Sequence, residues 1–102
     1  MRNHLNQENL RLYPYPAQDV VGRIVGSEAV LVQAERAKVK VLNEVGARIW
    51  ELADGSRSVL EIASQISREY QVGVEEAQTD AWNFIQQLVE RGLLLLSNQP
   101  RS

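Results

Sequence analysis

The chain has 102 residues, 44% of them hydrophobic and 24% charged, which suits one globular domain with a modest core. Without cysteine, and without the ~18 consecutive apolar residues that span a membrane, we expect neither disulfides, nor a thiolate metal site, nor a membrane as partner. A formal net charge of −2 disfavours nucleic acid as a partner, because nucleic-acid binders neutralise phosphates with Lys and Arg.

The first 17 residues predict a flexible N-terminal arm. They are mostly polar and end in Tyr-Pro-Tyr-Pro at 13–16, where alternating prolines disfavour both a helix and an interior strand. The segment lacks the apolar core of a secretory signal, so we expect a cytoplasmic protein. The single histidine, His4, lies in this arm without partners that could converge on it, which favours a solvated side chain over a catalytic or metal-binding one.

Residues 20–41 predict a three-stranded antiparallel meander. The stretches 20–25 and 29–32 are rich in β-branched residues and are separated by a Gly-Ser turn signal. The stretch 38–41 alternates lysine with valine, so the two valines face one side of the strand and the two lysines face the other.

The period then changes to that of helices. Asn43 is suited to cap the first helix, and Gly55 is expected to end it in a left-handed conformation. Trp50 is expected to close the junction between this helix and the sheet. Ser58 and Glu61 have the spacing of a capping box, which predicts the start of a second helix.

A third helix is predicted from about Val74 to Gly92, and the acidic residues near its start complement the positive end of the helix dipole. Five apolar residues at helical spacing form its core stripe: Ala77, Ala81, Phe84, Ile85 and Leu88. The four leucines at 93–96 are expected to close the core as an extended tail, and residues 97–102 to be frayed.

These elements predict an α+β fold: a three-stranded antiparallel β-meander followed by a three-helix bundle, similar to a winged helix-turn-helix, in a single domain at 18–96. In such a fold the third helix would be the one to enter a DNA groove. Its acidic residues Glu75, Glu76 and Asp80 suit a duplex poorly. A winged-helix DNA-binding regulator therefore stands as the alternative function.

Little in the chain predicts catalysis. No serine lies in a Gly-x-Ser-x-Gly elbow, and the glycines form no phosphate-binding motif. Glu75, Glu76 and Asp80 could hold a metal ion, although acidic residues are expected near a helix N-terminus in any case. We expect no enzymatic activity, no catalytic or metal-binding residue and no cofactor.

Three blocks of sequence carry a family pattern: LNEVGARIWELADG at 42–55, SVLEIASQISREY at 58–70 and DAWNFIQQLVERGLL at 80–94. Together they resemble the PqqD-like family, which is named for protein D of pyrroloquinoline quinone biosynthesis and includes recognition elements of ribosomally made, post-translationally modified peptides. The quinone-pathway members tend to read A-x-x-I-L-x-L-C-D-G in the first block. Gly46, Trp50 and Ala53 depart from that pattern, which favours a wider peptide-modification role.

The resemblance implies a non-catalytic module that binds the leader of a precursor peptide and presents it to a modifying enzyme, such as a radical S-adenosylmethionine enzyme. In the family the leader adds as a strand beside the third strand and packs against the third helix. The residues implied at the edge are Lys38, Val39, Lys40, Val41 and Leu42. The residues implied in the wall are Trp82, Ile85 and Val89, with Gln78 and Gln86 at its rim; for Trp82, a place in the core remains the competing interpretation.

Two further questions stay open from the sequence. Lys38 and Lys40 could protect an edge strand from aggregation, or could favour a leader with acidic residues. The chain could also be a structural subunit of a neighbouring enzyme that binds no leader. An open edge strand would additionally allow a homodimer.

Overall fold

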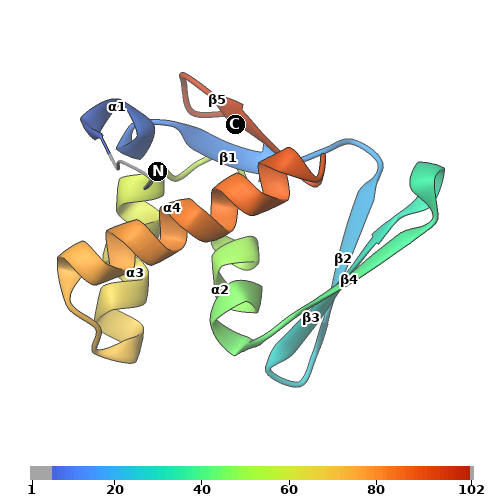
Figure 1. Cartoon of the computed structure of the whole chain (residues 1–102), viewed down its shortest axis with the longest axis horizontal. Helices are drawn as coiled ribbons and strands as arrows, with labels where there is room; N and C mark the ends of the chain where they lie inside the picture. Colours follow the sequence, from blue (N-terminus) through green and yellow to red (C-terminus); the bar gives the residue numbers. More distant parts are fainter. Residues whose placement is uncertain (1–5, 102) are drawn as a thin grey trace, which may run out of the picture.

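The computed structural model of the chain describes residues 6–101, so the expectation for His4 lies outside the described residues. The elements in order are α1 (Gln7–Leu10), β1 (Tyr13–Pro16), β2 (Val20–Val25), β3 (Glu28–Gln33), the 3-10 turn η1 (Ala34–Arg36), β4 (Lys38–Leu42), α2 (Glu44–Leu52), α3 (Val59–Tyr70), α4 (Val74–Glu90) and β5 (Leu94–Ser97). Figure 1 shows the sheet of β2, β3 and β4 at one side of the helices. The predicted α+β fold is confirmed.

The three-stranded sheet is antiparallel, with β3 between β2 and β4. Alternate residues of β3 are buried against the helices, namely Ala29, Leu31 and Gln33. Gly22 of β2 and Lys40 of β4 lie directly opposite Leu31. Because cross-strand partners share a face of the sheet, both belong to its helix-facing side.

Local signals start α2 and α3 where the sequence predicts. The Asn43 side chain accepts a hydrogen bond from the backbone N–H of Gly46 at 2.9 Å. Ser58 and Glu61 form both hydrogen bonds of the capping box, at 2.8 and 3.1 Å. Each of these bonds gives a partner to a backbone N–H at the start of a helix, where the helix itself supplies none.

The turn after α2 is held by both ends of the chain. Helix α2 already ends at Leu52, before the predicted stop, whereas Gly55 has the expected left-handed φ of +90°. The N–H of Gly55 donates to the carbonyl oxygen of Pro14 at 2.9 Å, and its carbonyl oxygen accepts from the N–H of Arg101 at 2.7 Å. The Arg101 guanidinium lies 4.0 Å from the centre of the Tyr15 ring. We expected residues 97–102 to be frayed, but these contacts hold the segment in place as far as Arg101.

The prediction of a flexible arm is wrong for residues 7–16, which form α1 and β1. β1 pairs antiparallel with β5, with Tyr13 opposite Ser97. The Pro14 carbonyl points away from β5 toward Gly55. Since the N–H and C=O of one strand residue point to the same side, the donor that proline lacks would also face away from β5. The strand can therefore contain alternating prolines.

We predict that Gly55→Ala destabilises the fold more than Gly26→Ala. Both glycines have positive φ, so each alanine carries a backbone cost of about 1–2 kcal/mol. A Cβ at Gly55 would also lie 3.0 Å from Cβ of Arg101 and 3.3 Å from Cβ of Tyr15, whereas a Cβ at Gly26 meets nothing within 4 Å. Urea unfolding of the two variants measures the difference, and equal losses would contradict the role of Gly55 in the turn.

An ion pair joins α2 to α3. The Arg48 guanidinium donates from Nε and Nη2 to the two carboxylate oxygens of Glu69, both at 2.8 Å. These hydrogen bonds lower the pKa of Glu69 to about 2 from the usual 4.5 and raise the pKa of Arg48. Because the folded state depresses the pKa of Glu69, the stabilisation is complete above pH 4.5 and is lost as the pH falls toward 2.

We therefore predict that Glu69→Gln lowers the free energy of unfolding by about 0.2–1 kcal/mol at pH 7, the range of solvent-screened pairs. The difference from the wild type should shrink between pH 4.5 and 2. Glu28→Gln is the control, because Glu28 forms no ion pair within residues 6–101. A Glu69→Gln effect that is the same at pH 7 and pH 2 would contradict the prediction.

Candidate functional site

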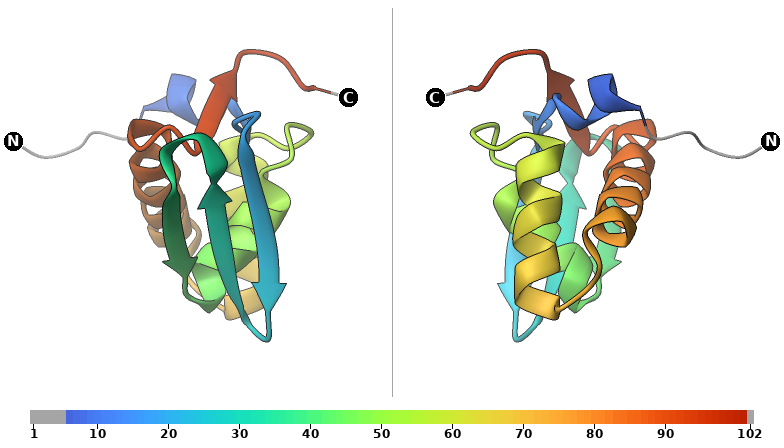
Figure 2. Two further views of the ribbon diagram at one scale, coloured as in Figure 1. Left: turned by 90° about the vertical axis from the view of Figure 1, so that its right-hand side faces the viewer. Right: turned by 90° about the vertical axis from the view of Figure 1, so that its left-hand side faces the viewer.

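One edge of the sheet lies open beside α4. Within the described chain, β4 pairs only with β3, so the N–H and C=O groups along its other edge have no strand partner. Figure 2 shows β4 as the outermost strand on the side of the sheet where α4 lies. β2 is the second unpaired edge, at the opposite side of the same sheet. An unpaired edge can take an additional strand through its backbone groups.

A small hollow of about 60 Å³ separates β4 from the end of α4. It is lined by Lys38, Val39 and Lys40 of β4, by Arg91 just after α4, and by Leu93. Leu93 is only 4% exposed and contributes an apolar surface to the hollow. The three cationic side chains carry charged groups on alkyl chains, which can cover apolar surface while their charges stay in water.

The lysines and valines of β4 face opposite sides, as predicted, and the lysines occupy the helix-facing side. Lys38 is paired with Gln33 and Lys40 with Leu31, both of which are buried on that side. Val39 and Val41 point outward and are 65% and 58% exposed. This reverses the usual arrangement of apolar residues inward. The lysine side chains thus lie toward the hollow next to α4, whereas Val39, which also borders the hollow, and Val41 form part of the outer face of the sheet.

The hollow gathers positive charge. Neither Lys38, Lys40 nor Arg91 forms an ion pair with any residue between 6 and 101. Arg36 lies close by, since a Cβ at Gly92 would lie 3.9 Å from its Nη1. In a chain whose net charge is −2, a cluster of cations that form no ion pair within residues 6–101 is a local feature that favours an anionic ligand.

The end of α4 is tied to the sheet. The Gln33 side-chain nitrogen donates to the carbonyl oxygen of Gly92 at 3.3 Å and to a carboxylate oxygen of Asp19 at 3.5 Å. Gln33 is buried and sits opposite Lys38 on β4. Because it connects β3 to the residue that follows Arg91, it helps to set the spacing between β4 and the end of α4.

The wall predicted from the sequence needs correction. Trp82 is 7% exposed and Ile85 is fully buried, so both belong to the core, which is the competing interpretation given above for Trp82. Their side chains offer almost no surface to a ligand. Gln78, Gln86 and Val89 are half-buried on α4. At roughly 100° per residue, Val89 lies on the same flank as Trp82.

A different flank of α4 lies toward α2 and the hollow. A Cβ at Gly46, four residues after β4, would lie 3.0 Å from the ring of Phe84, and Arg91 lines the hollow beside Lys38. Phe84 and Arg91 are seven positions apart, so at roughly 100° per residue they share one strip along the helix. This strip, from Phe84 to Arg91, leads along the helix to the hollow. The sequence signal for it is the small residue Gly46, which leaves room for an aromatic ring.

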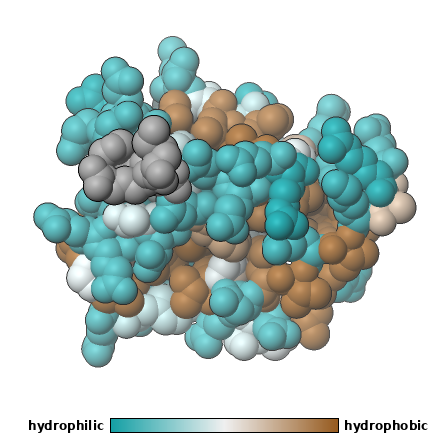
Figure 3. Space-filling view, viewed as in Figure 1, coloured by the Kyte–Doolittle hydropathy of each residue, from teal (hydrophilic) through white to brown (hydrophobic). Residues whose placement is uncertain are grey.

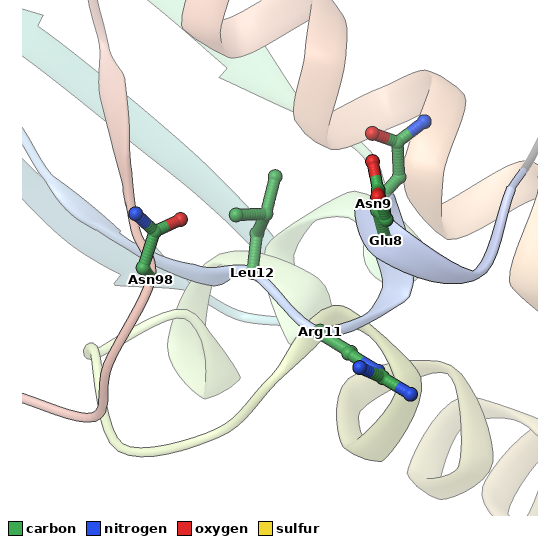
Figure 4. Close-up of a pocket in the computed structure, with 5 residues that line it drawn as sticks. All are labelled: Glu8, Asn9, Arg11, Leu12 and Asn98. Atoms are coloured by element: carbon green, nitrogen blue, oxygen red, sulfur yellow. The ribbon is translucent and has the colours of Figure 1, made fainter.

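The other surfaces of residues 6–101 bring together no comparable set of side chains. A pocket near the N-terminal segment is lined by Glu8, Asn9, Arg11, Leu12 and Asn98, but Arg11 points away from the rest (Figure 4). No group of three or more His, Cys, Asp or Glu side chains within residues 6–101 could hold a metal ion. Nor is any helix in that part of the chain long and apolar enough to cross a membrane.

The start of α4 does not favour the DNA-binding alternative. Glu75, Glu76 and Asp80 are all exposed there. In a winged helix the corresponding helix contacts a polyanion, and exposed carboxylates repel phosphates.

Comparison with known proteins gives a family match. Residues 28–94 match the family model described as coenzyme PQQ synthesis protein D (PqqD). The matched segment runs from the start of β3 to the start of β5 and includes β4, the hollow and all of α4. No curated protein sequence matches the chain.

Two solved structures have the same fold. TbiB1 in complex with the TbiA(beta) leader peptide is 29% identical, with a TM-score of 0.74, and the match covers 78% of this chain and 93% of that one. Lasso peptide synthetase B1 complexed with the leader peptide is 20% identical, with a TM-score of 0.74, and the match covers 81% of this chain and 98% of that one.

Proposed function

Because the chain belongs to the PqqD family, we propose that it is a peptide-recognition module that binds the leader of a ribosomally made precursor peptide. The leader adds as a strand along β4, Lys38–Leu42, and lies beside the strip of α4 from Phe84 to Arg91. The observation that carries this proposal is the unpaired β4 edge next to a hollow, in a fold shared with a protein in complex with its leader peptide. A peptide backbone supplies the N–H and C=O groups that such an edge lacks.

The proposal assigns no catalytic step to this chain. Members of the family that bind leaders typically act as partners of an enzyme, and we infer that this chain likewise presents its peptide to a modifying enzyme. The precursor is made on ribosomes, so the proposal includes the cytoplasmic location expected from the sequence. The departures of Gly46, Trp50 and Ala53 from the quinone-pathway pattern support a wider peptide-modification role.

Binding should perturb β4 and the adjacent strip of α4 together. The test is amide chemical-shift mapping of the full chain during titration with synthetic N-terminal halves of the short peptides encoded beside its gene. We expect the largest shifts in Lys38–Leu42 and between Phe84 and Arg91. Shifts confined to the opposite edge, β2, would contradict the proposed site, and the absence of binding by every such peptide would support the structural-subunit alternative.

Strand addition also predicts that only every second backbone N–H group of the peptide contributes to binding. Two versions of the bound peptide carry N-methyl groups on either its odd or its even residues. In a strand paired along one edge, only alternate N–H groups point to the partner. One version should therefore bind about thirtyfold more weakly than the other, if two hydrogen bonds of about 1 kcal/mol each are lost. Equal affinities by fluorescence anisotropy would contradict strand addition.

A further inference from the structure

A strand added to β4 would have two chemically different sides. Residues of that strand alternate between the helix-facing side, where Lys38 and Lys40 lie, and the outer side, where Val39 and Val41 lie. Cross-strand neighbours on one face have Cβ atoms about 4.5–5.5 Å apart, so each side of the added strand meets one kind of residue. The edge can therefore recognise an alternating pattern as well as a backbone.

The helix-facing side favours carboxylates. Lys38 and Lys40 are two residues apart, or roughly 6.6 Å along the strand, which is the spacing of alternate side chains on the added strand. Arg91, just after α4, adds a third positive charge, and Arg36 lies near the same end. Edge protection alone explains lysines on β4, but it does not explain why a cation from another element lines the same hollow.

The outer side favours apolar residues. Val21, Val32 and Val39 lie opposite one another across the three strands, and all three are exposed. Figure 3 shows apolar side chains gathered over these strands. An apolar residue on the added strand would extend this row by one position and would cover part of Val39 or Val41.

We propose that the β4 edge selects leader segments in which acidic residues alternate with apolar ones, the acidic residues facing Lys38, Lys40 and Arg91 and the apolar residues facing outward beside Val39 and Val41. This proposal rests on strand addition at β4, the function proposed above. It specifies the class of peptide within that function: an extended, acidic segment with a period of two.

The test compares synthetic twelve-residue peptides of fixed composition. One alternates Glu and Val. A second contains the same residues in blocks of two, which keeps its charge and composition but removes the alternation. A third alternates Lys and Val, and a short DNA duplex serves as a different polyanion. Fluorescence anisotropy should show that the Glu-Val peptide binds about tenfold more tightly than the block peptide. Its affinity should exceed that of the Lys-Val peptide by an even larger factor.

Neutral variants locate the effect. Lys38→Gln, Lys40→Gln and Arg91→Gln should each weaken binding of the Glu-Val peptide by about three- to fivefold and reduce its dependence on salt. Arg68→Gln is the matched control, because Arg68 lies on α3, outside the hollow, and loses the same charge. Thermal unfolding of all four variants checks that they are folded.

The outcomes separate this inference from the proposed function. If a leader peptide shifts β4 but its affinity is unchanged by salt and by the three hollow variants, strand addition stands and the acidic selection is overturned. If the Glu-Val and block peptides bind equally, the alternation is overturned. If the duplex binds more tightly than the Glu-Val peptide and loses affinity with the same variants, the hollow recognises nucleic acid instead.

Discussion

Gly22→Val should destabilise the fold by about 3 kcal/mol, at the upper end of what overpacking a core costs. Gly22 lies on the helix-facing side of β2, opposite Leu31. A Cβ there would overlap the Trp50 indole nitrogen and would lie 2.9 Å from Trp50 Cε2 and 3.1 Å from Leu31 Cδ2. The indole is a rigid, buried ring, so the β2 backbone or α2 would have to move.

Two further variants make this prediction specific. Gly73→Ala adds a Cβ that meets nothing within 4 Å, so it should change the free energy of unfolding by no more than about 0.5 kcal/mol. Trp50→Leu combined with Gly22→Val should recover part of the loss, because the smaller side chain makes room for valine. Urea unfolding followed by circular dichroism measures these three variants and Trp50→Leu alone. Additive losses in the double variant would show that Trp50 is not the obstacle.

Much of the fold could be predicted because its signals are local. The Asn43 cap and the capping box of Ser58 and Glu61 each depend on residues three positions apart. The alternation in β4 is equally local. β1 was missed because its partner, β5, lies more than 75 residues further along the chain, and no local pattern shows that pairing. The prolines then favoured a loop, since their orientation relative to β5 depends on the pairing itself.

The candidate site could likewise be predicted only in part. The sequence predicts the β4 edge, because the alternation of lysine and valine in the third strand of the meander is a local pattern in the sequence. It does not determine which flank of α4 faces that edge, since apolar residues lie on both sides of the core stripe. The Phe84 ring lies against Gly46, which leaves space for it, and this contact joins two helices. The orientation of α4 relative to the sheet therefore depends on tertiary packing.

Reversing the charges of β4 should reverse the kind of peptide that it prefers. In the double variant Lys38→Glu with Lys40→Glu, two attractive cross-strand pairs with a Glu-Val peptide become repulsive, and the same two pairs with a Lys-Val peptide become attractive. The ratio of the two affinities should change by about a hundredfold. The backbone edge is unchanged, so the variant should still add a strand, but one of the opposite charge.

The matched control for this reversal is Arg23→Glu with Arg68→Glu. Arg23 lies on β2 and Arg68 on α3, so the control brings the formal net charge from −2 to −6, as the test variant does, without altering the hollow. Isothermal titration of both variants with both peptides gives the four affinities. A local hollow predicts reversal in the β4 variant alone, because charges beyond about 10 Å are largely screened at 0.1 M salt. Equal changes in both variants would show that net charge, and not β4, selects the peptide.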